Sequence, residues 1–169
     1  GRTAPTFRPW YFLACQMHSQ PMGTTNFGNI LVAVDGSDQS MRAVDVAISL
    51  AAKYDSVLTA LYVIYIPFGE RLYPRAVWYE EFIKEIHKEA SEWLSEIQKR
   101  GKENGVVIES KMSETTESVA AEIVRYAKEN ETKLVVVGSR GKSDLEKLFL
   151  GSVAAGVLAY ATCPVLVVR

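Results

Sequence analysis

The chain has 169 residues, a length typical of one domain with a single sizeable core. Its 19 Lys+Arg residues nearly balance its 20 Asp+Glu residues, which argues against nucleic-acid binding through bulk positive charge and against a polybasic membrane anchor. No apolar run approaches the ~18 residues that a membrane span requires. The two cysteines, Cys15 and Cys163, cannot form a disulfide framework. We therefore expect a cytoplasmic globular protein with reduced thiols.

Residues 1–28 differ from the rest of the chain. They show neither helical nor strand periodicity, and they contain two arginines and no acidic residue. We expect a poorly ordered N-terminal tail here, followed by a domain over 29–169. The apolar run before Cys15 has about five residues, shorter than the ~7–15 of a signal-peptide core. Because the first residue is glycine, we expect a processed end or a cloning remnant, with Met17 or Met22 as alternative starts.

From residue 29 onward, apolar runs alternate with segments of helical periodicity. The run at 30–34 is typical of a strand buried on both faces, and Ser37 or Asp38 is suited to cap the helix that follows. Gly101 and Gly105 are expected to end the long second helix. The expected strands are 30–34, 57–66, a third from 106, 133–137 and 165–168. The expected helices are 41–51, 78–97, 119–126 and 152–160. The apolar stripe of the second helix consists of Trp78, Phe82, Ile86, Ala90, Trp93 and Ile97.

Five strands separated by four helices predict right-handed crossovers and a parallel sheet. The expected fold is an open, doubly wound, five-stranded α/β domain of three layers. Such sheets bind ligands beyond the carboxyl ends of their strands, where the strand order reverses. This rule places a ligand near Asp35, residues 63–66, Met112 and Gly138.

The loop after the fourth expected strand contains regularly placed glycines. Gly138 and Gly141 are followed by Gly151 and Ser152 in the pattern G-x2-G-x9-G-S. Glycine lets the backbone approach a ligand closely, and N–H groups at a helix start bind phosphate. The pattern is neither a dinucleotide-binding G-x-G-x-x-G nor a P-loop, since Val136 stands where the first P-loop glycine would be. A simple turn followed by a helix entry is the alternative interpretation.

Two segments resemble a universal stress protein domain of the ATP-binding branch, whose signature is G-2x-G-9x-G-[ST]: ILVAVDGSDQSMRAVDVAISLA and KLVVVGSRGKSDLEKLFLGSVAAGVLAYATCPVLVVR. The resemblance implies an adenine nucleotide alpha hydrolase-like, Rossmann-like fold. It implies ATP as the ligand, or AMP or ADP, with Mg²⁺ or Mn²⁺ held by the phosphates. It also implies a homodimer formed through the last strand, 165–168.

The resemblance further implies roles for individual residues. Asp35 contacts adenosine and the backbone of Val63 reads the adenine edge, although Asp35 could also serve only as a turn and cap residue. Arg140 and Lys142 lie in the glycine-containing loop and could neutralise phosphate charge, which places Arg140 among the candidate site residues, although solvated loop charges are the favoured interpretation. The remaining implied site residues are Ala33, Val137 and Gly138 near the nucleoside and Gly141, Gly151, Ser152 and Val153 around the triphosphate.

These observations favour an ATP-binding regulatory or stress-response switch with slow or no hydrolysis. The alternative is a slow ATPase or phosphotransferase in which Asp35 assists. A nucleotide-free interaction module is a third hypothesis, against which the glycine pattern argues. With only two histidines, His18 and His87, we expect no dedicated zinc site, and we expect His87 at the surface. We expect neither nucleic acid nor membrane as a partner.

Overall fold

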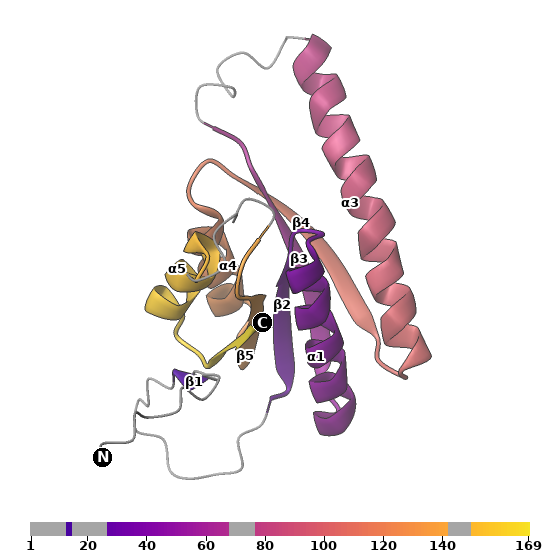
Figure 1. The fold of residues 1–169 in the computed structure, drawn as a ribbon, viewed down its shortest axis with the longest axis vertical. Helices are drawn as coiled ribbons and strands as arrows, with labels where there is room; N and C mark the ends of the chain where they lie inside the picture. The colour runs from indigo at the N-terminus through magenta and orange to yellow at the C-terminus, as the bar shows by residue number, and fades with distance from the viewer. Residues whose placement is uncertain (1–12, 15–26, 68–76, 142–149) are drawn as a thin grey trace, which may run out of the picture.

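The computed structural model of the chain describes residues 13–14, 27–67, 77–141 and 150–169. In these residues a mixed sheet carries helices on both faces, giving three layers (Figure 1). The strands are β1 (Leu13–Ala14), β2 (Asn29–Val34), β3 (Val57–Tyr65), β4 (Ile108–Thr115), β5 (Leu134–Gly138) and β6 (Val165–Val168); the helices are α1 (Asp38–Tyr54), α3 (Val77–Glu103), α4 (Val119–Glu129) and α5 (Ser152–Tyr160).

The strand order is β1-β6-β5-β2-β3-β4. The five strands from β2 to β6 pair in parallel, which confirms the expected doubly wound fold. The chain proceeds from β2 to β3 and β4 on one side, whereas β5 and β6 lie on the other. The strand order therefore reverses between β2 and β5, and a ligand crevice is expected at their carboxyl ends.

β1 is an addition that the sequence did not predict. It pairs antiparallel with β6, placing Leu13 opposite Leu166 and Ala14 opposite Val165. The other residues of the expected tail, apart from 27 and 28, lie outside the described part of the chain. The poorly ordered tail over 1–28 therefore stays a prediction.

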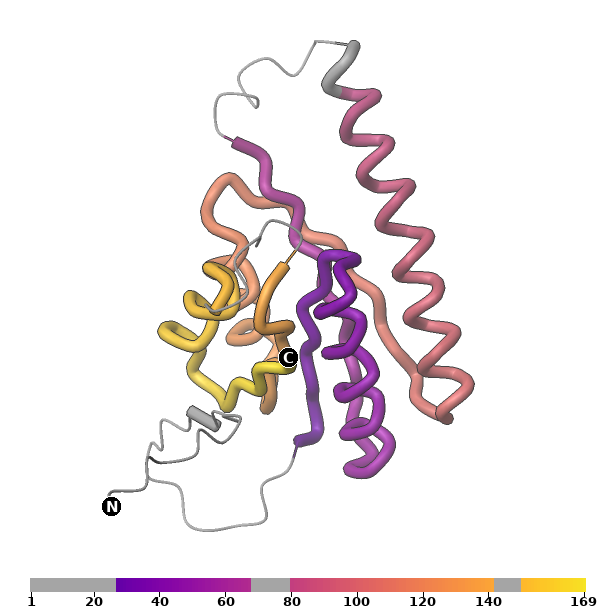
Figure 2. The backbone as a smooth tube through the Cα atoms, in the orientation of Figure 1, coloured from indigo at the N-terminus to yellow at the C-terminus, as the bar shows by residue number. Residues whose placement is uncertain are grey.

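Two apolar cores lie on opposite faces of the sheet. The face covered by α1 and α3 buries Val32, Leu58 and Val136, whereas the face covered by α4 and α5 buries Leu31 and Val135. Figure 2 shows these two helix pairs on opposite sides of the central strands. The alternation arises because successive side chains of a strand point to opposite faces, so β2 and β5 need apolar residues at nearly every position.

The junction between α3 and β4 differs from expectation. The helix continues through Gly101, whose added Cβ would lie 2.5 Å from the Cδ1 atom of Ile108. It ends at Glu103, before Gly105, which has a φ of 72°. The strand begins at Ile108 rather than 106, because the N–H of Val106 closes the helix end on the Gly101 carbonyl at 2.8 Å.

The apolar stripe of α3 only partly reaches the core. Ala90 and Ile97 are buried as expected, and Trp93 packs edge-to-face on Tyr62 of β3 with ring centroids 4.9 Å apart. Phe82, by contrast, is 51% exposed, because α3 extends beyond the sheet at its N-terminal end (Figure 1). Assigning Phe82 to the buried stripe was therefore wrong.

Candidate functional site

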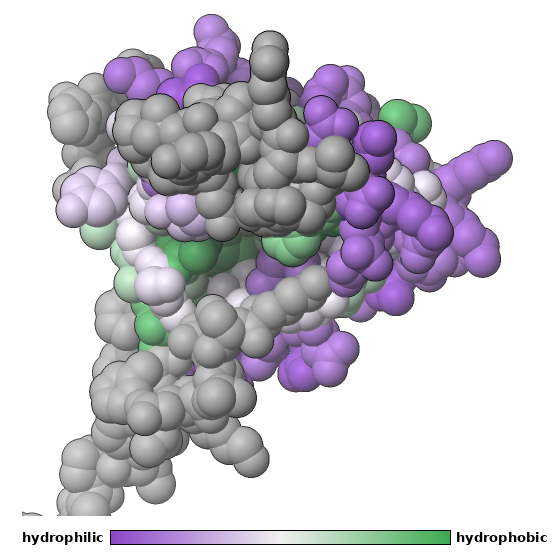
Figure 3. Space-filling view, turned by 90° about the horizontal axis from the view of Figure 1, so that it is seen from above, coloured by the Kyte–Doolittle hydropathy of each residue, from purple (hydrophilic) through white to green (hydrophobic). Residues whose placement is uncertain are grey.

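A cavity of about 330 Å³ opens at the carboxyl ends of β2, β3 and β5, where the strand order reverses. Its volume lies within the range of about 300–1,000 Å³ that is typical of small-molecule sites. Figure 3, which looks onto this edge of the sheet from above, shows hydrophobic residues in a hollow. All ten candidate site residues from the sequence analysis line this cavity: Ala33, Asp35, Val63, Val137, Gly138, Arg140, Gly141, Gly151, Ser152 and Val153.

Tyr65, which belongs to the expected segment 63–66, also lines the cavity, whereas seven further lining residues were not expected from the sequence: Val34, Ser40, Leu61, Tyr62, Val119, Ile123 and Ala154. Val119 and Ile123 are spaced i,i+4 on the apolar side of α4. Their helical periodicity could be recognised in the sequence, but their position at the cavity could not. Met112 was expected at this edge and does not line the cavity. It packs instead against the core beneath α1 and α3, because its strand position points to that face.

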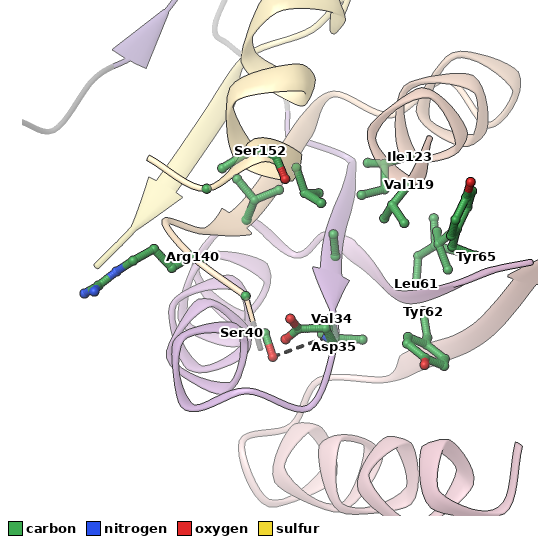
Figure 4. A pocket seen from close by; sticks show the side chains of 18 residues that line it. Val34, Asp35, Ser40, Leu61, Tyr62, Tyr65, Val119, Ile123, Arg140 and Ser152 are labelled. Atoms are coloured by element: carbon green, nitrogen blue, oxygen red, sulfur yellow. Dashed lines mark hydrogen bonds between the residues drawn. The ribbon is translucent and has the colours of Figure 1, made fainter. Parts of the chain in front are cut away.

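A tight turn holds the carboxylate of Asp35 at the end of β2. Gly36 has a φ of 76°, a left-handed conformation that favours glycine, and the Ser37 N–H donates to Asp35 Oδ1 at 3.0 Å. Ser37 then caps α1 by accepting from the Ser40 N–H at 3.2 Å. The Asp35 N–H donates to the Ser40 hydroxyl at 3.4 Å, drawn as the dashed line in Figure 4. The carboxylate is therefore fixed before any ligand arrives.

The loop after β5 approaches this carboxylate closely. An added Cβ at Gly141 would lie 2.6 Å from Asp35 Oδ2, and one at Gly138 would lie 3.0 Å from the backbone carbon of Gln39. Any larger residue at either position would displace a neighbour. Gly138 and Gly141 therefore let the loop after β5 lie close to the end of β2 and the start of α1. The alternative interpretation, a simple turn, did not predict this contact.

The start of α5 supplies donors to the opposite side of the cavity. Both α1 and α4 have serine N-caps, Ser37 and Ser118, whose side chains accept from a backbone N–H of the first turn. At α5 the N-cap is Gly151, which makes no side-chain cap hydrogen bond. Backbone N–H groups of the first helical turn have no carbonyl partner within the helix. Ser152, which Figure 4 shows across the cavity from Asp35, lies at this positive helix end.

Arg140 contributes little to the cavity through its charge. Figure 4 shows its guanidinium pointing away from the other labelled side chains. Lys142, the other basic residue considered for this loop, lies outside the described residues. In the part of the chain that the structure describes, the positive field at this site comes from backbone dipoles.

An ion pair between a buried glutamate and a largely exposed arginine fixes the wall formed by α4. Glu122 is 4% exposed and accepts from Arg125 Nη2 at 2.5 Å and from Arg125 Nε at 3.0 Å. It also accepts from the Ser113 hydroxyl of β4. Burial opposes the ionised form, but the hydrogen bonds from Arg125 and Ser113 outweigh it and lower the pKa of Glu122. Val119 and Ile123 are thereby held at the cavity wall.

The model of the universal stress protein family matches residues 26–169. The chain belongs to the universal stress protein family. A universal stress protein of Methanocaldococcus jannaschii is 38% identical over 148 residues, which cover 87% of this chain and 85% of that protein.

Solved structures of universal stress proteins share the fold. The protein UspA from Lactobacillus plantarum superposes with a TM-score of 0.74 at 27% identity, covering 85% of this chain and 99% of that one. A universal stress protein in complex with cAMP superposes with a TM-score of 0.59 at 29% identity, covering 85% and 98% of the two chains. The family that the two sequence segments indicated is thus confirmed.

Among the described residues of this universal stress protein, no helix is long and apolar enough to cross a membrane. The same residues contain no group of three His, Cys, Asp or Glu side chains that could hold a metal ion. His87 is partly exposed at the surface and contacts Glu114 Oε1 at 3.3 Å, away from the cavity.

Proposed function

We propose that this universal stress protein binds an adenine nucleotide, ATP foremost, in the cavity at the ends of β2 and β5, and that nucleotide occupancy regulates it. One observation carries the proposal: a single cavity combines apolar walls, a fixed carboxylate and an uncapped helix start on opposite sides. The apolar walls suit a base, the carboxylate suits ribose hydroxyls, and the helix start suits phosphates. The related universal stress protein solved with cAMP supports an adenine nucleotide as the ligand class.

The chemistry of the walls orients the nucleotide. Asp35 accepts hydrogen bonds from ribose hydroxyls and repels phosphate, so the nucleoside lies on its side, with Val63 beside the base. The phosphates lie at Ser152 and Val153, where the helix dipole favours negative charge. Mg²⁺ or Mn²⁺ is held by the phosphates, because the lining contributed by the described residues contains one carboxylate and it lies at the nucleoside end. AMP and ADP occupy the same nucleoside site with fewer phosphate contacts.

A binding switch fits the lining better than a robust enzyme. Among the described lining residues Asp35 supplies the one carboxylate, and it lies at the proposed nucleoside end, so no described carboxylate lies beside the phosphates to activate a water. Slow ATP hydrolysis or phosphoryl transfer assisted by Asp35 is the alternative. Release of inorganic phosphate at saturating Mg-ATP separates the two: a rate no greater than about one turnover per hour supports the switch, whereas about 1 s⁻¹, within the usual enzyme range, identifies an enzyme.

Calorimetric titration of a Gly151→Val variant tests the placement of the phosphates. The backbone angles of Gly151, φ −62° and ψ 152°, are open to valine, so its side chain should narrow the phosphate end without straining the backbone. We expect ATP affinity to fall at least about tenfold, or about 1.4 kcal/mol, with adenosine affinity retained. Ala155→Val, an exposed position on the same helix, is the matched control. Unchanged ATP affinity in Gly151→Val would refute the placement.

We also propose a cytoplasmic homodimer. β6 is the outermost of the parallel strands, and an apolar strand at a sheet edge tends to pair with another chain. Among the described residues, β1 pairs with Val165 and Leu166, so a second copy would pair at 167–168 or displace β1. The cytoplasmic location rests on the two cysteines, and the charge balance argues against nucleic acid as a partner.

A further inference from the structure

Ser139 lies directly behind the cavity and joins three elements. Its side chain is 3% exposed, between Gly138 and Arg140, which both line the cavity. Its N–H donates to the carbonyl of Val168 at the end of β6 at 2.6 Å, and its carbonyl accepts from the N–H of Gly151 at 2.8 Å. Its hydroxyl donates to Gln39 Oε1 in the first turn of α1 at 3.1 Å. Each polar group of this buried residue therefore has a partner in a different element.

We propose that Ser139 is a positioning residue for the phosphate end of the site, an inference that rests on the proposed nucleotide binding. Its carbonyl binds the N–H of Gly151, so this N–H is unavailable to a ligand and the helix start is fixed relative to β5. At the start of α5, the backbone donors that remain for phosphate are those after Gly151, beginning with Ser152. Ser139 thus sets both which amides face the cavity and where they lie.

The hydroxyl of Ser139 fixes the residue itself. Its bond to Gln39 spans 100 residues of sequence and ties the loop after β5 to the start of α1. An added Cβ at Gly138 would lie 3.0 Å from the backbone carbon of Gln39, so α1 packs closely on this loop. Loss of the hydroxyl leaves a half-buried amide oxygen without this donor and frees the loop to shift, which displaces the phosphate donors but not the apolar nucleoside walls.

The test compares ATP and adenosine binding by calorimetry in Ser139→Ala, Ser139→Thr and Gln39→Leu. Among the described residues, Ser139 holds the start of α5 directly and makes its hydrogen bonds to α1, α5 and β6 rather than to β2 or β3. The ratio of ATP affinity to adenosine affinity should therefore fall at least about fivefold in Ser139→Ala and in Gln39→Leu. The double variant should lose no more than either single variant, because both remove one interaction. Ser139→Thr, which keeps the hydroxyl, should retain the ratio.

Hydrogen exchange without nucleotide supplies a second measurement. The Gly151 N–H should exchange faster in Ser139→Ala and Gln39→Leu than in the unaltered chain. An unchanged affinity ratio, equal losses for ATP and adenosine, or unchanged Gly151 exchange would each overturn the role of Ser139. If the unaltered chain binds neither ligand, the proposed function fails as well, so the two failures are distinguishable.

Discussion

Asp35 and Gly141 lie so close together that any side chain at position 141 would push the carboxylate away. A Gly141→Ala variant places its Cβ 2.6 Å from Asp35 Oδ2, so the carboxylate must shift from its present position. Because Asp35 is proposed to hold the ribose, adenosine affinity should fall about tenfold, or about 1.4 kcal/mol. Fluorescence or calorimetric titration measures the change.

A second glycine provides the control for this prediction. Gly105 has a φ of 72°, lies outside the cavity lining, and has open space where a Cβ would be added. Gly105→Ala should therefore cost about 1 kcal/mol in unfolding free energy through backbone strain, with nucleotide affinity unchanged. If Gly141→Ala instead behaves like Gly105→Ala, the contact with Asp35 has no role in binding.

The pKa of Glu122 makes stability depend on pH. Its pKa in the folded chain is lowered from the ordinary value of 4.5, so its contribution is fully present above that value and is lost as the pH falls through the folded pKa. Glu122→Gln should lower the unfolding free energy by about 1–3 kcal/mol at pH 7, and the difference from the unaltered chain should shrink below pH 4.5.

Denaturant unfolding between pH 3 and pH 7 measures this effect. Glu129→Gln is the matched control, because Glu129 also binds Arg125 but is 57% exposed, and exposed pairs contribute about 0–1 kcal/mol. Equal pH profiles for the two variants would show that burial of Glu122 confers no special role.

The contribution of single residues was only partly visible in the sequence. The glycine pattern and Asp35 could be found in the sequence, because each follows an apolar strand and the glycines have a regular spacing. Ser139 and Ser40 could not be found, because their importance lies in hydrogen bonds to Gln39 and within the Asp35 turn. A serine beside a glycine gives no signal for a partner 100 residues away.

The bounds of the helices and strands were also only partly predictable from the sequence. The last helix and strand were predicted with the bounds that the structure has, because Gly151 and Pro164 mark where each is entered. The start of β4 was predicted two residues early, because the helix end captures the Val106 N–H. β1 has two residues, too few for any periodicity, and its pairing depends on β6.

The contact between α4 and α5 holds the two helices that flank the cavity. An added Cβ at Gly156 would lie 2.6 Å from the Cβ of Ala120. Gly156→Ala should therefore separate the helices and lower both the melting temperature and nucleotide affinity, despite the higher helix propensity of alanine. Ala120→Gly removes the opposing methyl group.

A double-mutant cycle isolates this contact. Combining Gly156→Ala with Ala120→Gly should restore part of the stability that each variant loses, with an interaction free energy of about 1 kcal/mol or more. Additive losses in thermal unfolding would indicate that the two helices tolerate a wider spacing.

At the scale of the whole molecule, β1 covers part of the edge proposed for dimerisation. The carbonyls of Pro164 and Val168 accept hydrogen bonds from the β5 side, so by alternation the backbone of Val165 and Val167 faces outward. Ala14 lies opposite Val165. Ala14→Pro removes the N–H needed for this pairing and should increase the dimer fraction in sedimentation equilibrium.

Ala14→Val is the control for this variant, since valine keeps the N–H and favours strands. It should leave the dimer fraction unchanged or lower it. Identical masses for the unaltered chain and both variants across micromolar concentrations would argue that β1 and a second copy do not compete for this edge.

The overall charge of −1 gives no hint of an anionic ligand. The residues that form the site nevertheless provide a local positive field, because backbone N–H groups at an uncapped helix start face the cavity. Net charge limits the non-specific partners of a protein, whereas the proposed nucleotide binding relies on dipoles arranged at one sheet edge.

The central claim is that the cavity binds an adenine nucleotide, and titration of the purified full chain with Mg-ATP tests it most directly. The protein is first stripped of bound nucleotide by denaturation and refolding, and the released material is identified by mass spectrometry. We expect an adenine nucleotide in that fraction and saturable binding of one ATP per chain. No released nucleotide, together with no binding at millimolar Mg-ATP, would contradict the claim.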